Sequence, residues 1–340
     1  MSNNKSSWLG ILALLLVCVF THPSKSVQAQ MAEMEAARKE GRVVVYGSVV
    51  PQAMQELHRG FEKKYGVKVE YWRAVGGAIA DRSLAEWRAG HPKFDVIEAY
   101  RGMQLILKKE GLYTRYIPPS SEVFPAQFKE RDGLITPWRV TPIAILYNTD
   151  LVKPGEAPRT LDGLLEPRWK KKISIPDPAL HSTTAQFLWN LEKLKGEKWR
   201  EFVKALAKQE PHLVESFAPV TTAIIRGEAS VGITYIKYIN QYKGPIGYVP
   251  SEKYLAECFY MGLSAKANNP NAARLYIDYA ASENGQKAIV KDSEFVLYPG
   301  IYPPVKDAEK IVPNLVFMDS PTTDELKNLR AEFQQIFVGR

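Results

Sequence analysis

The sequence predicts an α/β protein of two lobes, each an open mixed sheet flanked by helices. Three observations lead to this prediction. Buried strands alternate with amphipathic helices near the N-terminus, a second series of the same kind begins near residue 170, and a long apolar segment with two prolines separates them. Such alternation is typical of open sheets covered by helices. The length of 340 residues also fits two lobes.

The first series of elements alternates between strand and helix. Glu40–Val50 is a continuous apolar run and predicts a buried parallel strand that ends in a Gly-Ser turn. Pro51 is expected to begin a helix that ends at Tyr65, because Gly66 stops it. The next elements are a strand, a helix and a strand, at residues 67–74, 75–90 and 94–100. The order strand-helix-strand-helix-strand favours an open sheet.

A long extended segment, Leu134–Val152, is predicted to connect the two lobes. It is apolar and contains Pro137 and Pro142. Because proline cannot donate a hydrogen bond to a neighbouring strand, a central strand would not tolerate these residues, whereas a crossover between lobes would. We therefore expect the chain to leave the first lobe near residue 142 and to return near residue 260.

The second series repeats the alternation. Its expected elements are a strand at 171–177, a helix starting after 181, a strand at 212–217, a short helix at 218–229 and a strand at 230–236. A further strand begins at Cys258, and the helix after it has Asn269 as its cap and Pro270 in its first turn. The tail from Thr322 is expected to be helical. We assign residues 30–141 and 264–340 to the first lobe, and residues 142–263 to the second.

The N-terminal 29 residues are predicted to be a cleaved signal peptide. Lys5 gives a basic start, Trp8–Phe20 is uncharged and mostly apolar, and Val27–Ala29 fits a small-residue cleavage site. An uncleaved anchor and a lipid on Cys18 are the alternatives. Val17 stands where a lipidation site prefers a small residue, and the apolar run is short for a membrane span. We expect a periplasmic protein whose one remaining cysteine, Cys258, is buried and inert.

Composition and motifs exclude several classes of function. The net charge of +8 is spread along the chain, and its one dense cluster, Trp169–Ile173, is short, so we expect no nucleic-acid partner. The sequence has no GxSxG, HExxH, CxxC, Walker or GxGxxG motif. We therefore expect neither an enzyme nor a bound cofactor.

Four turns between a strand and a helix carry small or hydroxyl residues. They are Gly47-Ser48, Gly76-Gly77-Ala78, His181-Ser182-Thr183-Thr184 and Pro219-Val220-Thr221-Thr222. Ligands of open α/β sheets bind at such turns, and the free N–H groups of a helix N-terminus favour an anion. The alternative for each turn is a helix cap, which uses the same geometry. Four such turns across two lobes favour ligand binding as well as capping.

Four further residues are candidate ligand contacts. Tyr235 and Tyr238 follow a predicted strand, and their side chains suit hydrogen bonding, stacking or metal binding. Tyr100 stands at a similar strand end. Arg139, in the crossover, suits a bidentate pair with a carboxylate or phosphate. The alternatives are aromatic packing for the tyrosines and a surface position for the arginine.

Six motifs in order carry a resemblance to a known family. They are RVVVYGS, GGAIADRSLAEWRAGHPKFDVIEA, PWRVTPIAILYNTDLV, KKISIPDPALHSTTAQFL, RGEASVGITY and NPNAARLYIDYAASENGQKAI. The chain resembles the bacterial extracellular solute-binding proteins of ABC importers, nearest to the ferric-ion-binding-like branch, which also includes thiamine, phosphonate and phosphorylated-sugar binders. The resemblance implies the type 2 periplasmic-binding fold with two hinge strands, and a monomer that closes on a solute and delivers it to a membrane permease.

The resemblance also implies roles for individual residues. The matching positions are Ser182, Thr183 and Thr184 in an anion-holding turn, Thr221 and Thr222 in a second turn, Gly77 and Ala78 in a first-lobe turn, and Tyr235 near the ligand tyrosines. Ser48 belongs to the first-strand turn, which supplies a His in some ferric binders and has none here.

Other departures favour a solute different from bare iron. Ferric binders have two adjacent tyrosines where this chain has Tyr235 and Tyr238, and Tyr100 replaces an expected acidic ligand, although Glu98 is close. Iron needs several hard anionic oxygens together. We therefore expect a small anionic solute, phosphate-bearing or carboxylate. The alternatives are ferric iron with an anion, an exported enzyme with Glu98 or His181 as base, and a sensor that contacts a membrane receptor.

The first testable prediction concerns export. We expect the mature protein to begin at Gln30, because the small-residue site ends at Ala29. Intact mass spectrometry of protein isolated from the periplasm measures this directly. A chain that retains Met1, or that carries lipid on Cys18, would contradict the prediction.

Overall fold

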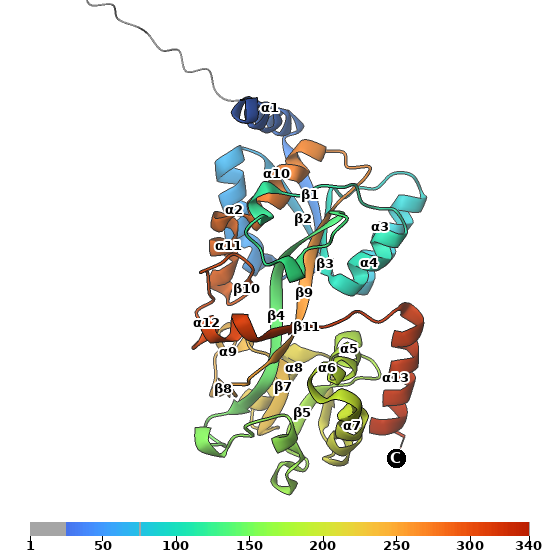
Figure 1. Cartoon of the computed structure of the whole chain (residues 1–340), viewed down its shortest axis with the longest axis vertical. Coiled ribbons are helices and arrows are strands. Elements are labelled where there is room, and N and C mark those ends of the chain that lie inside the picture. Colours follow the sequence, from blue (N-terminus) through green and yellow to red (C-terminus); the bar gives the residue numbers. More distant parts are fainter. Residues whose placement is uncertain (1–24, 75, 340) are drawn as a thin grey trace, which may run out of the picture.

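The computed structural model describes residues 25–74 and 76–339 and shows two lobes stacked along the long axis of the molecule (Figure 1). The predicted leader lies mostly outside the described residues, with Lys5 and Cys18 among those that are not described. Within the described part of the chain, no helix is long and apolar enough to cross a membrane.

Two mixed sheets form the lobes. The strands are β1 (Arg42–Gly47), β2 (Lys68–Arg73), β3 (Val96–Tyr100), β4 (Ile135–Asn148), β5 (Ile173–Pro176), β6 (His212–Val214), β7 (Val231–Tyr235), β8 (Ile246–Tyr248), β9 (Tyr254–Leu263), β10 (Phe295–Val296) and β11 (Leu315–Phe317). Their order is β2-β1-β3-β9-β4-β7-β5-β6, with β10 and β8 beside β4 and β11 beside β9. This arrangement confirms the predicted two-lobe α/β class.

Helices cover both sheets. They are α1 (Lys25–Glu40), α2 (Pro51–Tyr65), α3 (Gly76–Arg88), α4 (Arg101–Lys109), α5 (Ser182–Asn190), α6 (Glu192–Lys195), α7 (Trp199–Lys208), α8 (Phe217–Ile225), α9 (Tyr238–Gln241), α10 (Pro270–Ala281), α11 (Glu283–Ile289), α12 (Ala308–Ile311) and α13 (Thr323–Phe337). In the first lobe, α2 packs Leu57 and Phe61 against Tyr276 of α10.

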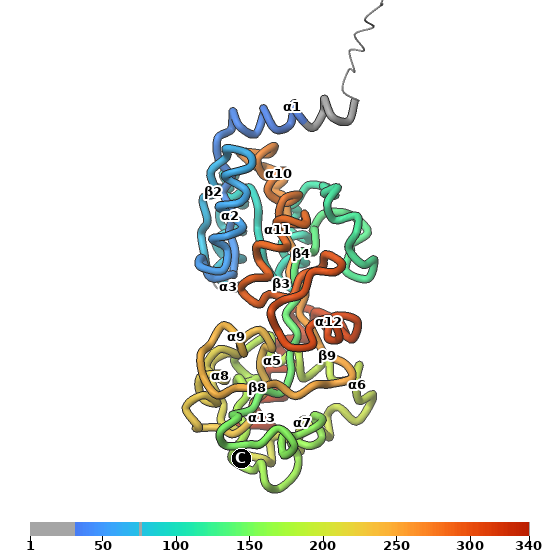
Figure 2. Tube along the Cα trace, turned by 90° about the vertical axis from the view of Figure 1, so that its left-hand side faces the viewer, coloured from blue at the N-terminus to red at the C-terminus, as the bar shows by residue number. Residues whose placement is uncertain are grey.

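The strands β4 and β9 join the lobes. Figure 2 shows that the molecule is narrow where these strands pass from one lobe to the other. They pair in antiparallel fashion from Ile135 opposite Gly262 to Pro142 opposite Ala256. Beyond this point β4 pairs with β7, beginning at Ile143 opposite Tyr235. Each lobe is therefore built on one half of β4.

The two prolines of β4 do not prevent it from lying at the centre of the sheet order, contrary to our expectation for a central strand. The register against β9 shifts between Pro137 and Arg139. Pro142 stands where β4 changes partners, and its carbonyl accepts a hydrogen bond from the Ile236 N–H at 3.1 Å. Both residues therefore occupy irregular positions, where the missing N–H does not break a ladder.

Local signals place the helix ends well. The α2 helix begins at Pro51 and ends at Tyr65, and Gly66 takes φ of +70° while its N–H donates to the Glu62 carbonyl. Asn269 is the N-cap of α10, as expected, but its side chain donates to Asp95 at 2.9 Å instead of capping the helix. The buried Asp95 carboxylate thereby ties α10 to the strand β3.

The C-terminal helix α13 packs on the second lobe, although our boundary at residue 264 placed it with the first. Its buried Leu329 and Phe333 belong to the same apolar cluster as Phe187 and Phe202. Arg330 also donates to the Ala179 carbonyl at 2.7 Å. The boundary followed the order of elements along the sequence, which does not show which lobe covers the apolar face of a terminal helix.

This packing predicts the effect of a substitution in α13. Replacing Phe333 with Ala should lower the free energy of unfolding by about 3–5 kcal/mol, because the ring is buried in the second-lobe core. Denaturant unfolding of the ligand-free protein measures this. Gln334→Ala, on the exposed face of the same helix, serves as the control and should change little. Equal stability of Phe333→Ala and the control would contradict the prediction.

Candidate functional site

A cleft that is open to solvent lies at the junction of the two lobes. Its lining residues come from the first lobe (Ser48, Val49, Val50, Gln52, Ala53, Arg73, Asp292, Glu294), from the hinge strands (Arg139, Thr141, Phe259) and from the second lobe (His181, Ser216, Ala218, Tyr235, Lys237, Tyr238, Gln241, Tyr242). The cleft thus collects the turns at which strands of both sheets meet helices, as ligand sites of open sheets do.

The first-lobe wall is the turn between β1 and α2. The backbone N–H and the hydroxyl of Ser48 both donate to the Glu98 carboxylate, at 2.8 and 2.9 Å. These bonds fix the turn and direct the N-terminus of α2 toward the cleft. The N-cap residue Val50 supplies no side-chain cap, and Gln52 and Ala53 of the first turn line the cleft.

A buried charge cluster forms the floor of the cleft. Arg139 donates through Nη2 to Glu98 at 3.0 Å and through Nη1 to Glu294 at 3.1 Å. Lys237 of the second lobe approaches the other Glu294 oxygen at 2.5 Å. Burial alone would raise the pKa of Glu294, but Lys237 and Arg139 outweigh it and hold that pKa below its ordinary value. The two cations and two carboxylates therefore balance one another.

Arg139 was expected either to bind a ligand or to lie on the surface. It is 2% exposed, and both ends of its guanidinium are used by protein carboxylates. Its plane lies over the Phe259 ring, 3.6 Å from the centroid, and among the described residues its Nε–H has no hydrogen-bond partner. Glu98, the partner of the Arg139 Nη2 atom, is itself fully buried.

The second-lobe wall presents two helix N-termini. His181 is the N-cap of α5, and Ser216 is the N-cap of α8; neither makes a side-chain cap bond. The His181 Nδ1 lies 2.8 Å from the Thr184 hydroxyl instead. Burial lowers the pKa of His181 to about 4, so the ring is neutral at pH 7. The positive ends of both helices therefore face the cleft without an acidic side chain on them.

Three tyrosines line the same wall. The Tyr235 and Tyr238 rings are 5.7 Å apart between centroids, and Tyr238 and Tyr242 are 5.3 Å apart. Burial raises the pKa of Tyr235 and of Tyr238 well above the ordinary value of 10. Their hydroxyls are therefore neutral and suited to donate hydrogen bonds.

Of the predicted site residues, Ser48, Arg139, Tyr235 and Tyr238 line the cleft. The lining does not include the others, which are Gly77, Ala78, Tyr100, Ser182, Thr183, Thr184, Thr221 and Thr222. Gly77 and Ala78 are exposed at the start of α3. Ser182 and Thr183 are half-buried in the first turn of α5, directly after the cleft residue His181.

The predicted turn at residues 219–222 is helical, because α8 already begins at Phe217. Proline is tolerated in the first turn of a helix, so Pro219 does not delay the start. The hydroxyls of Thr221 and Thr222 therefore point back along the helix, 3.5 and 3.4 Å from the Phe217 and Ala218 carbonyls. Such bonds to the preceding turn are common for threonine inside helices.

Several cleft residues were missed by the sequence analysis. Arg73 is exposed at the end of β2 and has no ion-pair partner among the described residues. Lys237 lies between the two predicted tyrosines, in the run TYIKY. Ser216 immediately precedes α8. Strand ends and residues that precede a helix were the available signals for Arg73 and Ser216.

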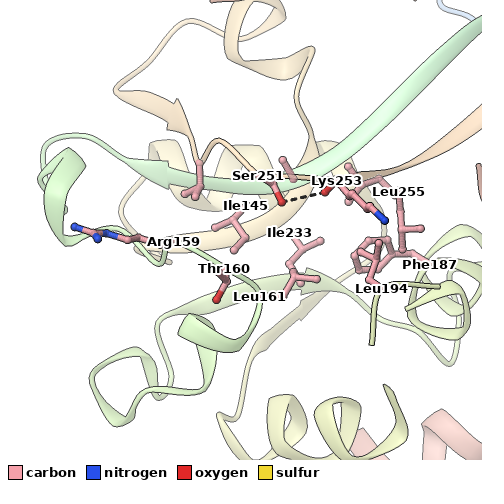
Figure 3. A pocket seen from close by; sticks show the side chains of 13 residues that line it. Ile145, Arg159, Thr160, Leu161, Phe187, Leu194, Ile233, Ser251, Lys253 and Leu255 are labelled. Carbon is pink, nitrogen blue, oxygen red and sulfur yellow. Dashed lines mark hydrogen bonds between the residues drawn. The ribbon is translucent and has the colours of Figure 1, made fainter. Parts of the chain in front are cut away.

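A second cavity lies inside the second lobe (Figure 3). The side chains around it are mostly apolar, including Ile145, Phe187, Ile233 and Leu255. The Arg159 guanidinium points away from these side chains in the figure. This cavity belongs to the apolar interior of the lobe, whereas the interlobe cleft supplies convergent polar groups.

The chain thus has two lobes, with a solvent-open cleft beside the strands that join them. The chain belongs to the family described as "Bacterial extracellular solute-binding protein", whose sequence profile matches residues 91–319. This membership confirms the family resemblance seen in the sequence.

Two relatives of known sequence are similar to this chain. An uncharacterized protein of Haemophilus influenzae is 26% identical over 326 residues, which are 90% of this chain and 89% of that protein. A probable ABC transporter periplasmic-binding protein of Sinorhizobium fredii is 31% identical over 122 residues, which are 36% of this chain and 34% of that protein.

Solved structures share the fold. The periplasmic binding protein AfuA from Actinobacillus pleuropneumoniae, with fructose-6-phosphate bound, is 24% identical with a TM-score of 0.72, covering 87% of this chain and 98% of that one. Iron-bound HitA from Pseudomonas aeruginosa is 16% identical with a TM-score of 0.68, covering 87% and 98%. One fold therefore serves chemically different ligands.

The charge cluster predicts a large loss of stability when its central cation is removed. Arg139→Met should lower the free energy of unfolding by about 3–5 kcal/mol, because Glu98 and Glu294 would remain buried without Arg139 between them. Denaturant unfolding at pH 7 measures this. Arg200→Met, which breaks an exposed pair with Glu332, is the control and should cost under about 1 kcal/mol. Similar losses in the two variants would contradict the structural role of Arg139.

Proposed function

We propose that this protein captures a small anionic solute, phosphate-bearing or carboxylate, for an ABC importer. The solute would bind in the interlobe cleft and would be passed to the membrane permease. Membership of an extracellular solute-binding family supports the transport role. One observation carries the choice of an anion: the N-termini of α2, α5 and α8 all lie at the cleft, and none has a side-chain cap.

The electrostatics of the cleft favour the same class of solute. Arg139 and Lys237 are already balanced by carboxylates, so they attract an anion weakly. Arg73 is a cleft cation without an ion pair among the described residues, and it can meet a phosphate or carboxylate directly. Backbone N–H groups at helix N-termini add fixed partial positive charge from both lobes.

Donors on both lobes also suit a mechanism of closure. Arg73 and α2 belong to the first lobe, whereas α5, α8 and the tyrosines belong to the second. A solute that contacts both walls binds the closed form better than the open form and so shifts the population toward closure. The permease would then recognise the closed form.

Within this site we propose specific contacts for the predicted residues. Ser182 and Thr183 begin α5 and would hold the anion after a small movement of the turn at His181. Tyr235 and Tyr238 would donate hydrogen bonds to hydroxyl groups of the solute. The exported-enzyme alternative is less favoured, because Glu98 is occupied by Ser48 and Arg139.

The anion proposal predicts a difference between binding and stability. Arg73→Gln should weaken binding about ten-fold or more, since it removes a charged hydrogen bond. Ser182→Ala and Thr183→Ala should also weaken binding, by roughly 1.5–3 kcal/mol, and should lower the stability of the ligand-free protein less. Native mass spectrometry of unrefolded protein identifies the retained solute, and calorimetric titration with that solute or with fructose 6-phosphate measures affinity.

The control for this experiment is Arg115→Gln, an exposed arginine of the first lobe outside the cleft lining. Its affinity should match that of the unaltered protein. Unchanged affinity in Arg73→Gln, Ser182→Ala and Thr183→Ala would contradict anion binding at these helix ends. Retention of one ferric ion per chain, with a visible charge-transfer band, would instead favour the iron alternative.

A further inference from the structure

The hinge strand β9 contains a buried acidic residue, Glu257. It lies opposite Thr141 of β4, the other hinge strand, and is 1% exposed. Alternate residues of a strand share a face, so Glu257 points to the same side as Phe259, which lines the cleft. The carboxyl group therefore lies under the floor of the cleft, at the axis of the hinge.

Groups from both lobes lie near enough to this carboxyl to interact with it electrostatically. Tyr100 and Arg101, at the junction of β3 and α4, belong to the first lobe, and Gln186 of α5 and Tyr235 of β7 belong to the second. The thiol of Cys258 is next to it on β9. We refer to this arrangement of Tyr100, Arg101, Gln186 and Tyr235 around Glu257 as the Glu257 seam. Rotation of the lobes about β4 and β9 would pull its two halves apart.

Neither oxygen of the Glu257 carboxyl has a hydrogen-bond partner of acceptable geometry among the described residues. The Arg101 guanidinium is already engaged by Glu130, at 2.8 Å. Buried polar groups are nearly always paired, and an unpaired buried carboxylate is costly. A neutral carboxylic acid avoids most of that cost.

We propose that Glu257 couples rotation of the lobes to proton exchange: its carboxyl is held protonated while the Glu257 seam is shut and ionises when the seam opens. This inference rests on hinge motion in the proposed function, but it does not depend on which solute is bound. Each opening event would release one proton, and each closing event would take one up.

The direction in which the pKa of Glu257 is shifted agrees with this proposal. Burial raises its pKa from 4.5 to about 8, against the opposing influences of the Arg101 backbone, the Gln186 side chain and the Arg101 charge. A solvated carboxyl in the open form would return toward 4.5. The shut form is then favoured most below pH 4.5, and this advantage is lost as the pH rises toward 8.

The experiment measures the distance between the lobes in the ligand-free protein. Spin labels on Val123→Cys and Leu151→Cys report it by pulsed electron paramagnetic resonance, since these side chains are exposed on different lobes and lie outside the cleft lining. Cys258 is buried and should not react. Between pH 5.5 and 7.5 the ratio of shut to open molecules should fall, by up to about 100-fold. A distance distribution that does not change over this range would overturn the proposal.

Substitutions identify the group responsible. Glu257→Gln cannot ionise and should remove the dependence on pH, and so should Glu257→Met, which serves if the first variant does not fold. Glu252→Gln, an exposed acidic residue close by in the sequence, is the matched control and should keep the dependence. A Glu257 variant that keeps the full dependence on pH would also overturn the proposal. Because no solute is present, these outcomes are separate from the test of anion binding.

Discussion

The antiparallel pairing of β4 with β9 is the constraint on which the rest of the molecule depends. The same fourteen-residue strand β4 pairs with β9 in its first half and with β7 in its second. Each lobe therefore takes its position from one continuous strand, and the cleft forms where that strand changes partners. Arg139, Thr141 and Phe259 lie on this segment, so the floor of the cleft and the hinge are the same residues.

Because the hinge segment is buried, the charged side chains on it must be paired with opposite charges. The positive charges of Arg139 and Lys237 are balanced by Glu98 and Glu294. These ion pairs hold the floor of the cleft in place, but they leave little net charge that could attract a solute. For the proposed anion, attraction would then come from the walls, where the helix N-termini lie and where Arg73 has no ion-pair partner among the described residues. In the proposed function, the structural ion pairs lie in the floor and recognition of the solute takes place at the walls, so a different solute would require changes in the walls first.

Much of the fold was predictable because its signals are local. Pro51 and Gly66 mark both ends of α2, and the apolar strands of each lobe are continuous in the sequence. The site was harder to predict, because it depends on contacts between residues that are far apart in the sequence. Arg139 looked available for a ligand until Glu98 and Glu294 were placed beside it, and Thr221 was displaced from the helix start because α8 begins four residues earlier. Lys237 is held at the cleft by its ion pair with Glu294, which is 57 residues away in the sequence.

The packing of α13 on the second lobe has a mechanical consequence. The chain must pass the hinge a third time to reach it, and it does so through β11, which pairs in parallel with β9 at Leu315 opposite Tyr254 (Figure 1). A junction of two strands can bend and also twist, whereas three adjoining chain segments form a ribbon that resists torsion. In the proposed closure, the lobes should therefore rotate about a single axis. The same residues on the opposite walls of the cleft would then meet each time the cleft closes.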